Sequence, residues 1–187
     1  MSTPERGLRS DAQRNRERII EAAREVFASK GLDAPMEEIA RAAGVSPATP
    51  YHRFSSREGL IEAVLLPRMD AAVATAKDAL AHDDPWQGLQ QVIRDMVAFH
   101  TADRGFCQAC ADRGFPANSK TAEREQQYKR LLERIIKRAK SAKVVRRDFS
   151  VDDLCGLVIG AAYAVRSTQL GISLDRQIDL ILNGIHA

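Results

Sequence analysis

Two stretches of the sequence combine residue types that could do chemistry. The first is SPATPYHRF, residues 46–54, in which small and polar residues are followed by the phenol of Tyr51, the imidazole of His52 and the guanidinium of Arg53. The second is the CxxC motif Cys107-Gln-Ala-Cys110, whose thiolates could bind a metal or cycle between thiol and disulfide. The two stretches point to different classes of protein, a nucleic-acid binder and a thiol-based sensor or enzyme.

The spacing of residues 46–54 predicts a short helix. Ser46 is a candidate N-cap and Pro47 would take the first helical position, where a missing N–H costs nothing. Pro50 would then be the fourth helical residue and would lose one terminal hydrogen bond. That loss is milder than a proline in mid-helix, which costs roughly 3 kcal/mol. The two prolines therefore stiffen the first turn without excluding a helix.

This short helix is the third of three in the N-terminal part of the chain. The first should run from Asp11 to Gly31, with apolar residues every three or four positions, and the second from Pro35 to Gly44. Three helices with a tight Gly-Val-Ser turn between the second and third form a helix-turn-helix. The same geometry also occurs in plain helical bundles, so the periodicity alone leaves both interpretations open.

A helix that reads DNA needs small or polar residues at its front, so that its backbone can approach the major groove. Residues 46–49 satisfy this requirement, and the three larger side chains that follow could reach phosphates. Arg57, at the head of the next helix, adds charge beside free backbone N–H groups. The candidate DNA-binding residues are Ser46, Pro47, Ala48, Thr49, Tyr51, His52, Arg53 and Arg57.

The rest of the chain also has helical spacing, and no stretch alternates like a half-buried strand. We expect an all-α protein of about nine helices, including a short one within the weakly periodic residues 103–118. The predicted organisation is a disordered basic arm (1–10), a helix-turn-helix DNA-binding domain (11–56) and a C-terminal helical domain (57–187). Ser55-x-x-Glu58 and Ser150 mark two further helix starts.

Composition narrows the class of protein. The chain has 187 residues, of which 44% are hydrophobic and 28% charged, with a net charge of +3 that is too small to imply an anionic partner. Residues 120–147 carry eleven Lys and Arg against three Glu, which favours a solvated helix face over a nucleic-acid patch. No apolar run of roughly 18 residues is present to span a membrane. With three cysteines and no export signal, we expect a cytoplasmic protein.

The stretch RERIIEAAREVFASKGLDAPMEEIARAAGVSPATPYHRFSSREGLIEAVL resembles the N-terminal domain of the TetR family of transcriptional regulators. The resemblance implies a dimeric, all-helical DNA-binding protein, most often a repressor, whose C-terminal domain binds a small-molecule inducer; it implies no cofactor. By position, Thr49, Tyr51, His52 and Arg57 match residues that touch phosphates in the family, and Pro47 and Ala48 match residues that face bases. Pro50 departs from the family, which usually places Leu or Val there.

The C-terminal part of the chain contains a helix without a polar face. Gly156, Gly160 and Ala164 form a smooth strip on it, and apolar residues cover its other sides, so it must be buried all round. It is either a core helix of one subunit or, as we favour, half of a four-helix bundle with a twin subunit. The predicted dimer interface comprises Gly156, Val158, Gly160, Ala164, Ile178, Ile181 and Leu182.

A dimer would hold two recognition helices about 34–36 Å apart, as a palindromic operator requires. Our hypothesis is that an effector moves the long helix beginning at Arg57 and so releases the DNA. A residue that is a candidate for the effector pocket is more often plain core than the wall of such a pocket. These candidates are Met69, Trp86, Met96, Phe99, His100, Phe106, Phe115, Tyr128 and Tyr163.

Alternative functions remain at this stage. Cys107 and Cys110 could form a redox or metal sensor, or the centre of a small thiol oxidoreductase, although two buried small residues explain an i, i+3 spacing as well. Non-specific compaction of DNA is a further hypothesis for the function. The chain has no Gly-rich phosphate loop, nucleophile elbow or HExxH motif, so we expect neither an enzyme nor a resident metal.

Overall fold

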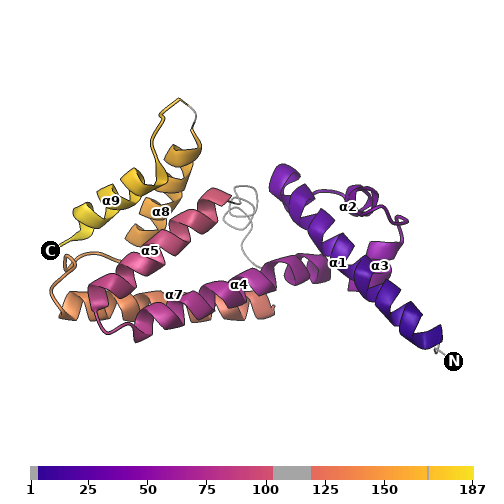
Figure 1. Ribbon diagram of the computed structural model, residues 1–187, viewed down its shortest axis with the longest axis horizontal. Coiled ribbons are helices and arrows are strands. Elements are labelled where there is room, and N and C mark those ends of the chain that lie inside the picture. The colour runs from indigo at the N-terminus through magenta and orange to yellow at the C-terminus, as the bar shows by residue number, and fades with distance from the viewer. Residues whose placement is uncertain (1–3, 103–118, 168) are drawn as a thin grey trace. The chain divides into compact units, whose positions relative to one another are not determined.

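A computed structural model describes residues 4–102, 119–167 and 169–187 of the chain. Within these residues the protein has eight helices and one isolated β-bridge, between Val145 and His186, which agrees with the predicted all-α class (Figure 1). None of the described helices is long and apolar enough to cross a membrane. The helix expected within 103–118 lies outside the described residues. The helices are α1 (Pro4–Lys30), α2 (Met36–Ala43), α3 (Thr49–Phe54), α4 (Arg57–Ala81), α5 (Pro85–Ala102), α7 (Lys120–Ser141), α8 (Val151–Arg166) and α9 (Leu174–Ile185).

The chain divides into two compact units, and the division falls inside α4, between Arg68 and Met69. The first unit contains α1, α2, α3 and the first part of α4, together with the described residues 119–122. The second contains the rest of α4, α5, α8, α9 and α7 from Glu123 onward. The start of α4 belongs to the first unit because its apolar residues pack with those of α1 and α2.

The first unit is built on the apolar stripe of α1. Ile19, Ala23 and Phe27 are fully buried, and they pack in one cluster with apolar residues of α2, α3 and α4. Helix α1 begins at Pro4, before the expected start at Asp11, so residues 4–10 are helical where we expected a disordered arm. Other buried members of this cluster include Met36, Ile39, Phe54, Leu60, Val64 and Leu65.

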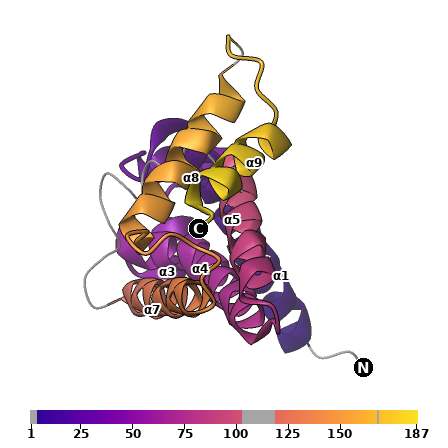
Figure 2. The same ribbon diagram turned by 90° about the vertical axis from the view of Figure 1, so that its left-hand side faces the viewer.

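The second unit has its own core, to which α4, α5, α7, α8 and α9 all contribute. Figure 2 shows α8 and α9 lying side by side with α5 against them. Helix α8 starts as its sequence predicts. The Ser150 hydroxyl accepts the N–H of Asp153 at 3.1 Å, and the Asp153 carboxylate accepts the N–H of Ser150 at 2.8 Å, which completes a capping box.

Candidate nucleic-acid interface

The turn between α2 and α3 is set by Gly44. This residue has φ +63°, a left-handed conformation that favours glycine, and its N–H caps the end of α2 by bonding to the Ala40 and Arg41 carbonyls. A Cβ atom at Gly44 would lie 2.8 Å from Nη2 of Arg18. That guanidinium nitrogen donates to the Ala43 carbonyl at 2.6 Å. The glycine therefore gives both the backbone turn and the space for Arg18 to hold the end of α2.

Helix α3 begins at Thr49, three residues after the Ser46 N-cap that we expected. The Thr49 N–H donates to the Ser46 carbonyl at 2.9 Å, and the two hydroxyls lie 2.7 Å apart, so residues 46–49 form a turn before the helix. Pro50 is consequently the second helical residue and not the fourth. Because the first N–H groups of a helix have no intrahelical acceptor, Pro50 removes no hydrogen bond from α3.

The side chains of α3 separate cleanly into anchors and an exposed surface. Pro50 and Phe54 are buried, and the Arg16 guanidinium lies 5.3 Å from the centre of the Phe54 ring. The buried Pro50 ring occupies the inward position at which the family that the N-terminal sequence resembles usually has Leu or Val. Thr49 is half-buried. The exposed residues, which we call the α3 face, are Ser46, Pro47, Ala48, Tyr51, His52 and Arg53.

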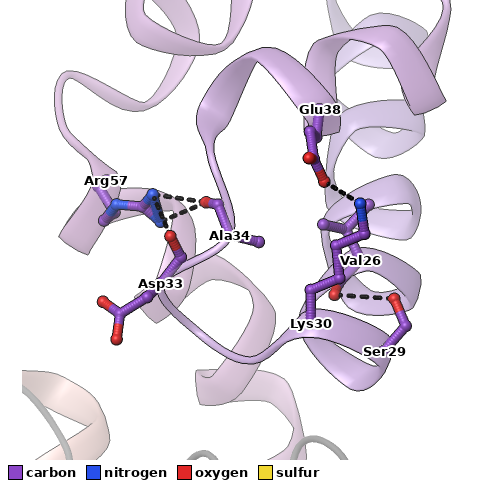
Figure 3. Close-up of polar contacts among 7 residues, drawn as sticks. All are labelled: Val26, Ser29, Lys30, Asp33, Ala34, Glu38 and Arg57. Atoms are coloured by element: carbon purple, nitrogen blue, oxygen red, sulfur yellow. Dashed lines mark hydrogen bonds and ion pairs between the residues drawn. The ribbon is translucent and has the colours of Figure 1, made fainter.

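Arg57 differs from the other predicted DNA-binding residues. It is half-buried, and its guanidinium donates to the main-chain carbonyls of Leu32, Asp33 and Ala34, in the loop between α1 and α2. Figure 3 shows the bonds to Asp33 and Ala34. The next helix is capped by Ser56, whose hydroxyl accepts the Gly59 N–H at 3.0 Å, and not by Ser55, which has φ +60°. Sequence reasoning missed both arginine contacts, because each joins residues more than 20 positions apart.

An exposed apolar surface lies on α8 and α9 of the second unit. Tyr163 is 65% exposed and Ile159 is 50% exposed, and a Cβ atom added at Gly156 or Gly160 would meet nothing within 4 Å. A groove of about 500 Å³ between the two helices is lined in part by Leu157, Leu180 and Gly184. We call this surface the α8–α9 face; its residues are Gly156, Leu157, Ile159, Gly160, Tyr163 and Leu180.

The predicted dimer residues fall into two sets. Gly156 and Gly160 are exposed on this face, and Ala164 is half-buried. The other four, Val158, Ile178, Ile181 and Leu182, are buried in the core of their own unit. Helix α8 is apolar all round, so its sequence does not show which side packs within the subunit.

The described candidates for an effector pocket differ in their burial and in their neighbours. Met69 and Met96 are buried, whereas Phe99 is exposed beside His100, their ring centres 5.8 Å apart. The half-buried Trp86 contacts the His186 ring edge to face, at 4.9 Å. Tyr163 belongs to the α8–α9 face, and Phe106 and Phe115 lie outside the described residues.

Two of these candidates have shifted pKa values. Burial, followed by the positive charge of Arg166, lowers the pKa of His100 below its ordinary value, and Arg166 Nη1 donates to the His100 carbonyl at 2.5 Å. Burial also raises the pKa of the Tyr128 hydroxyl, with further contributions from Cys155 and Asp95. Neutral His100 and Tyr128 side chains could therefore supply polar contacts in a mostly apolar unit.

The cysteine chemistry has little support in the described part of the chain. Cys107 and Cys110 lie outside it. Cys155 is half-buried, and burial followed by the nearby Asp152 raises the pKa of its thiol, which lowers the fraction of reactive thiolate. Among the residues that the structure describes, no group of three or more His, Cys, Asp or Glu side chains is placed to hold a metal ion.

Comparison with known proteins accounts for both parts of the chain. Residues 19–64 match the family described as "Bacterial regulatory proteins, tetR family". This match covers the helix-turn-helix, including the α3 face and Arg57. Residues 84–187 match "Transcriptional regulator SbtR-like, C-terminal domain". The α8–α9 face belongs to this second match.

Individual relatives agree with these matches. BetI of Rhizobium meliloti, an HTH-type transcriptional regulator, is 34% identical over 166 residues that cover 85% of this chain and 78% of BetI. UidR of Escherichia coli, another HTH-type transcriptional regulator, is 38% identical over 74 residues, which span 39% of this chain and only 38% of UidR. The crystal structure of a TetR transcription regulatory protein from Mycobacterium vanbaalenii superposes with a TM-score of 0.58 at 32% identity. That superposition covers 96% of this chain and 99% of the other.

The helix-turn-helix and its exposed α3 face thus lie within a match to a family of transcriptional regulators, which are not enzymes. The chain belongs to the TetR family of DNA-binding transcriptional regulators, with an SbtR-like C-terminal domain.

Proposed function

We propose that this protein is a cytoplasmic repressor that binds a palindromic operator as a homodimer and is released by a small-molecule effector. The observation that carries the proposal is the α3 face. It presents small residues and three hydrogen-bonding side chains to solvent, while Pro50 and Phe54 fix the helix from behind. The family match supports DNA as the partner.

The chemistry of the α3 face fits duplex DNA. Pro47 and Ala48 have no bulky side chain, so the backbone in front of α3 can approach base edges in the major groove. Tyr51 and Arg53 follow, with a hydroxyl and a guanidinium that can donate to phosphate oxygens on either side of the groove. We assign base reading to the front of the face and backbone contacts to its later residues.

We propose the α8–α9 face as the homodimer interface. It is a continuous exposed apolar surface on two neighbouring helices, and its two glycines leave space for the close approach of another helix. Isologous pairing of this face with its copy would bury it and form a four-helix bundle. Such a bundle would set the separation of two α3 helices at the spacing that a palindrome needs.

The effector remains unidentified in our proposal, and its site is placed in the second unit. His100 and Tyr128 are the described polar groups that we expect to orient it, with the buried Met96, one turn before His100 on α5, as an apolar neighbour. Helix α4 begins in the first unit and ends in the second, so a displacement of α4 is the simplest route from effector to DNA.

The test of operator binding uses a fluorescent duplex taken from the promoter of the protein's own gene. We expect anisotropy titrations to give nanomolar affinity that falls steeply with added salt, and much weaker binding to a scrambled duplex of equal length. Equal affinity for both duplexes would favour non-specific compaction. No binding to either duplex would contradict the proposal.

The effector is sought by thermal denaturation in a library of small metabolites. A compound that binds the folded protein raises the melting temperature by mass action. We expect at least one such compound to weaken operator binding in the anisotropy assay at the same concentration. A library in which every stabilising compound leaves operator affinity unchanged would contradict effector release.

A further inference from the structure

Helix α2 is held at both ends by arginines that come from other helices of the first unit. At its end, Arg18 of α1 donates to the Ala43 carbonyl at 2.6 Å. Before its start, Arg57 of α4 reaches into the loop that joins α1 to α2. Between them these two side chains fix the helix that precedes the DNA-reading turn.

The Arg57 guanidinium makes four hydrogen bonds to the loop. Nη1 donates to the carbonyls of Leu32 at 2.9 Å and Ala34 at 2.7 Å. Nη2 donates to the carbonyls of Asp33 at 3.2 Å and Ala34 at 2.5 Å. Since each Nη atom carries two hydrogens, these bonds engage all four donors at the end of the side chain.

The hydrogen bonds from Arg57 to the Leu32 and Ala34 carbonyls are part-buried, and the bond to the Asp33 carbonyl is exposed. Leu32 and Ala34 are each only 4% exposed, and both are members of the first unit's hydrophobic cluster. A guanidinium that turned outward to a phosphate would remove these hydrogen bonds and leave two part-buried carbonyls without this donor, which costs free energy. The geometry therefore favours the bonds within the protein over a contact with DNA.

A second tie near this loop is of a different kind. Lys30 at the end of α1 and Glu38 of α2 form an ion pair of 2.6 Å, visible beside the Arg57 bonds in Figure 3. The lysine side chain is 57% exposed, so solvent screens the pair and it contributes little. Lys30 thus offers a matched control, since it is a cation at the end of α1 beside the same loop, and its acceptor Glu38 is not buried.

We propose that Arg57 is a positioning residue for DNA binding and not a phosphate ligand. By binding three successive carbonyls it fixes the loop before α2, and through α2 it sets the turn and helix that carry the α3 face. The expected effect of Arg57 on DNA binding rests on the proposed operator binding, whereas its hydrogen bonds to the loop do not. It reassigns a side chain that the sequence resemblance places on the DNA backbone.

The experiment compares Arg57→Lys and Arg57→Gln with Lys30→Gln and Arg53→Gln in the full-length protein. Hydrogen exchange, without DNA, is measured at the amides of Ala34, Glu38 and Ile39, which donate within the loop and the first turn of α2. Anisotropy with the promoter duplex then gives the slope of log affinity against log salt. Lysine keeps the charge that a phosphate needs but lacks the planar fork that three carbonyls need, so Arg57→Lys separates the two roles.

We expect both Arg57 variants to exchange these amides at least about tenfold faster than the wild type, with an unchanged salt slope. Lys30→Gln should leave the exchange rates at the wild-type level, and Arg53→Gln should lower the salt slope by about one without affecting exchange. Wild-type exchange rates in Arg57→Gln, or a salt slope reduced by about one in that variant, would overturn the proposal. If Arg57→Gln does not fold, the exchange rates of Arg57→Lys decide, because lysine keeps the charge and its salt slope should stay at the wild-type value in either role. The exchange result stands even if no operator binding is found, so failure of the proposed function is distinguishable.

Discussion

The α3 face and the α8–α9 face are both open to solvent, yet they expose opposite chemistry. The α3 face carries a phenol, an imidazole and a guanidinium after three small residues. The α8–α9 face carries aliphatic and aromatic side chains around two glycines, and none of its six residues is charged. Exposure alone therefore does not identify an interface; the groups that are exposed indicate the partner.

The two faces also differ in what supports them. Two buried residues, Pro50 and Phe54, anchor the helix that carries the α3 face, and polar bonds from α1 and α4 hold the preceding helix α2 at its two ends. The α8–α9 face lies on longer helices whose inner sides belong to a large core. Removing apolar surface from water contributes roughly 25 cal/mol of stabilisation for each Å² buried, so covering the α8–α9 face would be favourable.

The largest effect is expected on the α8–α9 face. In the Ile159→Glu variant a carboxylate would have to be buried at the centre of the dimer, so we expect a monomer in analytical ultracentrifugation. Because a palindromic operator binds two helix-turn-helix units, one on each half-site, operator affinity of the monomer should fall by about 100-fold or more. A matched control is Ala71→Glu, on an exposed position of α4, which should remain dimeric.

The Gly160→Ala variant sharpens this first prediction. An added Cβ meets nothing within a single subunit, so α8 should gain about 0.5–1 kcal/mol of helix stability from the loss of glycine. The same methyl group should weaken dimerisation if another helix packs closely there. A Gly160→Ala protein that dimerises more tightly than the wild type would place the interface elsewhere.

The second effect is expected on the α3 face. In the Tyr51→Ala variant a side chain that is 48% exposed is removed without disturbing the core, so folding and dimerisation should be unchanged. Operator affinity should fall by about 10-fold or more, in line with roughly 1.5–3 kcal/mol for a hydrogen bond to a charged group. Tyr51→Phe, which lacks only the hydroxyl, distinguishes a phosphate hydrogen bond from ring packing. Wild-type operator affinity in Tyr51→Ala would remove this face from the interface.

The contrast between the two faces bears on what sequence can predict. Local signals were sufficient for α2, whose end is fixed by the left-handed Gly44, and for α8, whose start is fixed by Ser150 and Asp153. They were less accurate for α3, since a turn at residues 46–49 and a helix starting at Ser46 have similar residue preferences. Boundaries that depend on one or two hydrogen bonds are hard to place from residue types.

Contacts between distant residues could not be predicted at all. An arginine at the head of a helix fits a phosphate contact as well as it fits a contact with a loop, and for Arg57 the loop contact becomes visible only in the folded position of Ala34. Likewise, Val158 and Ile159 are adjacent apolar residues, but one is fully buried and the other is half exposed. A helix that is apolar all round carries no periodicity to tell its inner side from its outer side.

A third effect concerns the start of α8, where the helix that carries the α8–α9 face is capped. The Ser150→Ala variant lacks the hydroxyl that accepts the Asp153 N–H, and we expect a loss of about 1 kcal/mol in the free energy of unfolding, measured in urea. Ser141→Ala is a suitable control, because that hydroxyl donates to a carbonyl at the end of α7 and caps no helix start. The cap lies outside the α8–α9 face, so dimers of folded Ser150→Ala should be as tight as wild-type dimers. A loss of dimer affinity in folded protein would extend the face to the start of α8.

The smallest effect concerns the other end of α8, where Arg166 donates to the His100 carbonyl. Burial and Arg166 lower the pKa of His100 below its ordinary value of 6.5 in the folded protein, so between the two pKa values the unfolded chain binds more protons. Stability must then rise with pH through this window, and His100 should destabilise the fold as the pH falls below about 6.5. We therefore expect urea unfolding of His100→Asn to lose less stability than the wild type between pH 7.5 and pH 5.5. Equal losses would mean that His100 is protonated as easily in the folded protein as in the unfolded chain. His100 is not one of the six residues of the α8–α9 face, so neither outcome should alter dimerisation at pH 7.5.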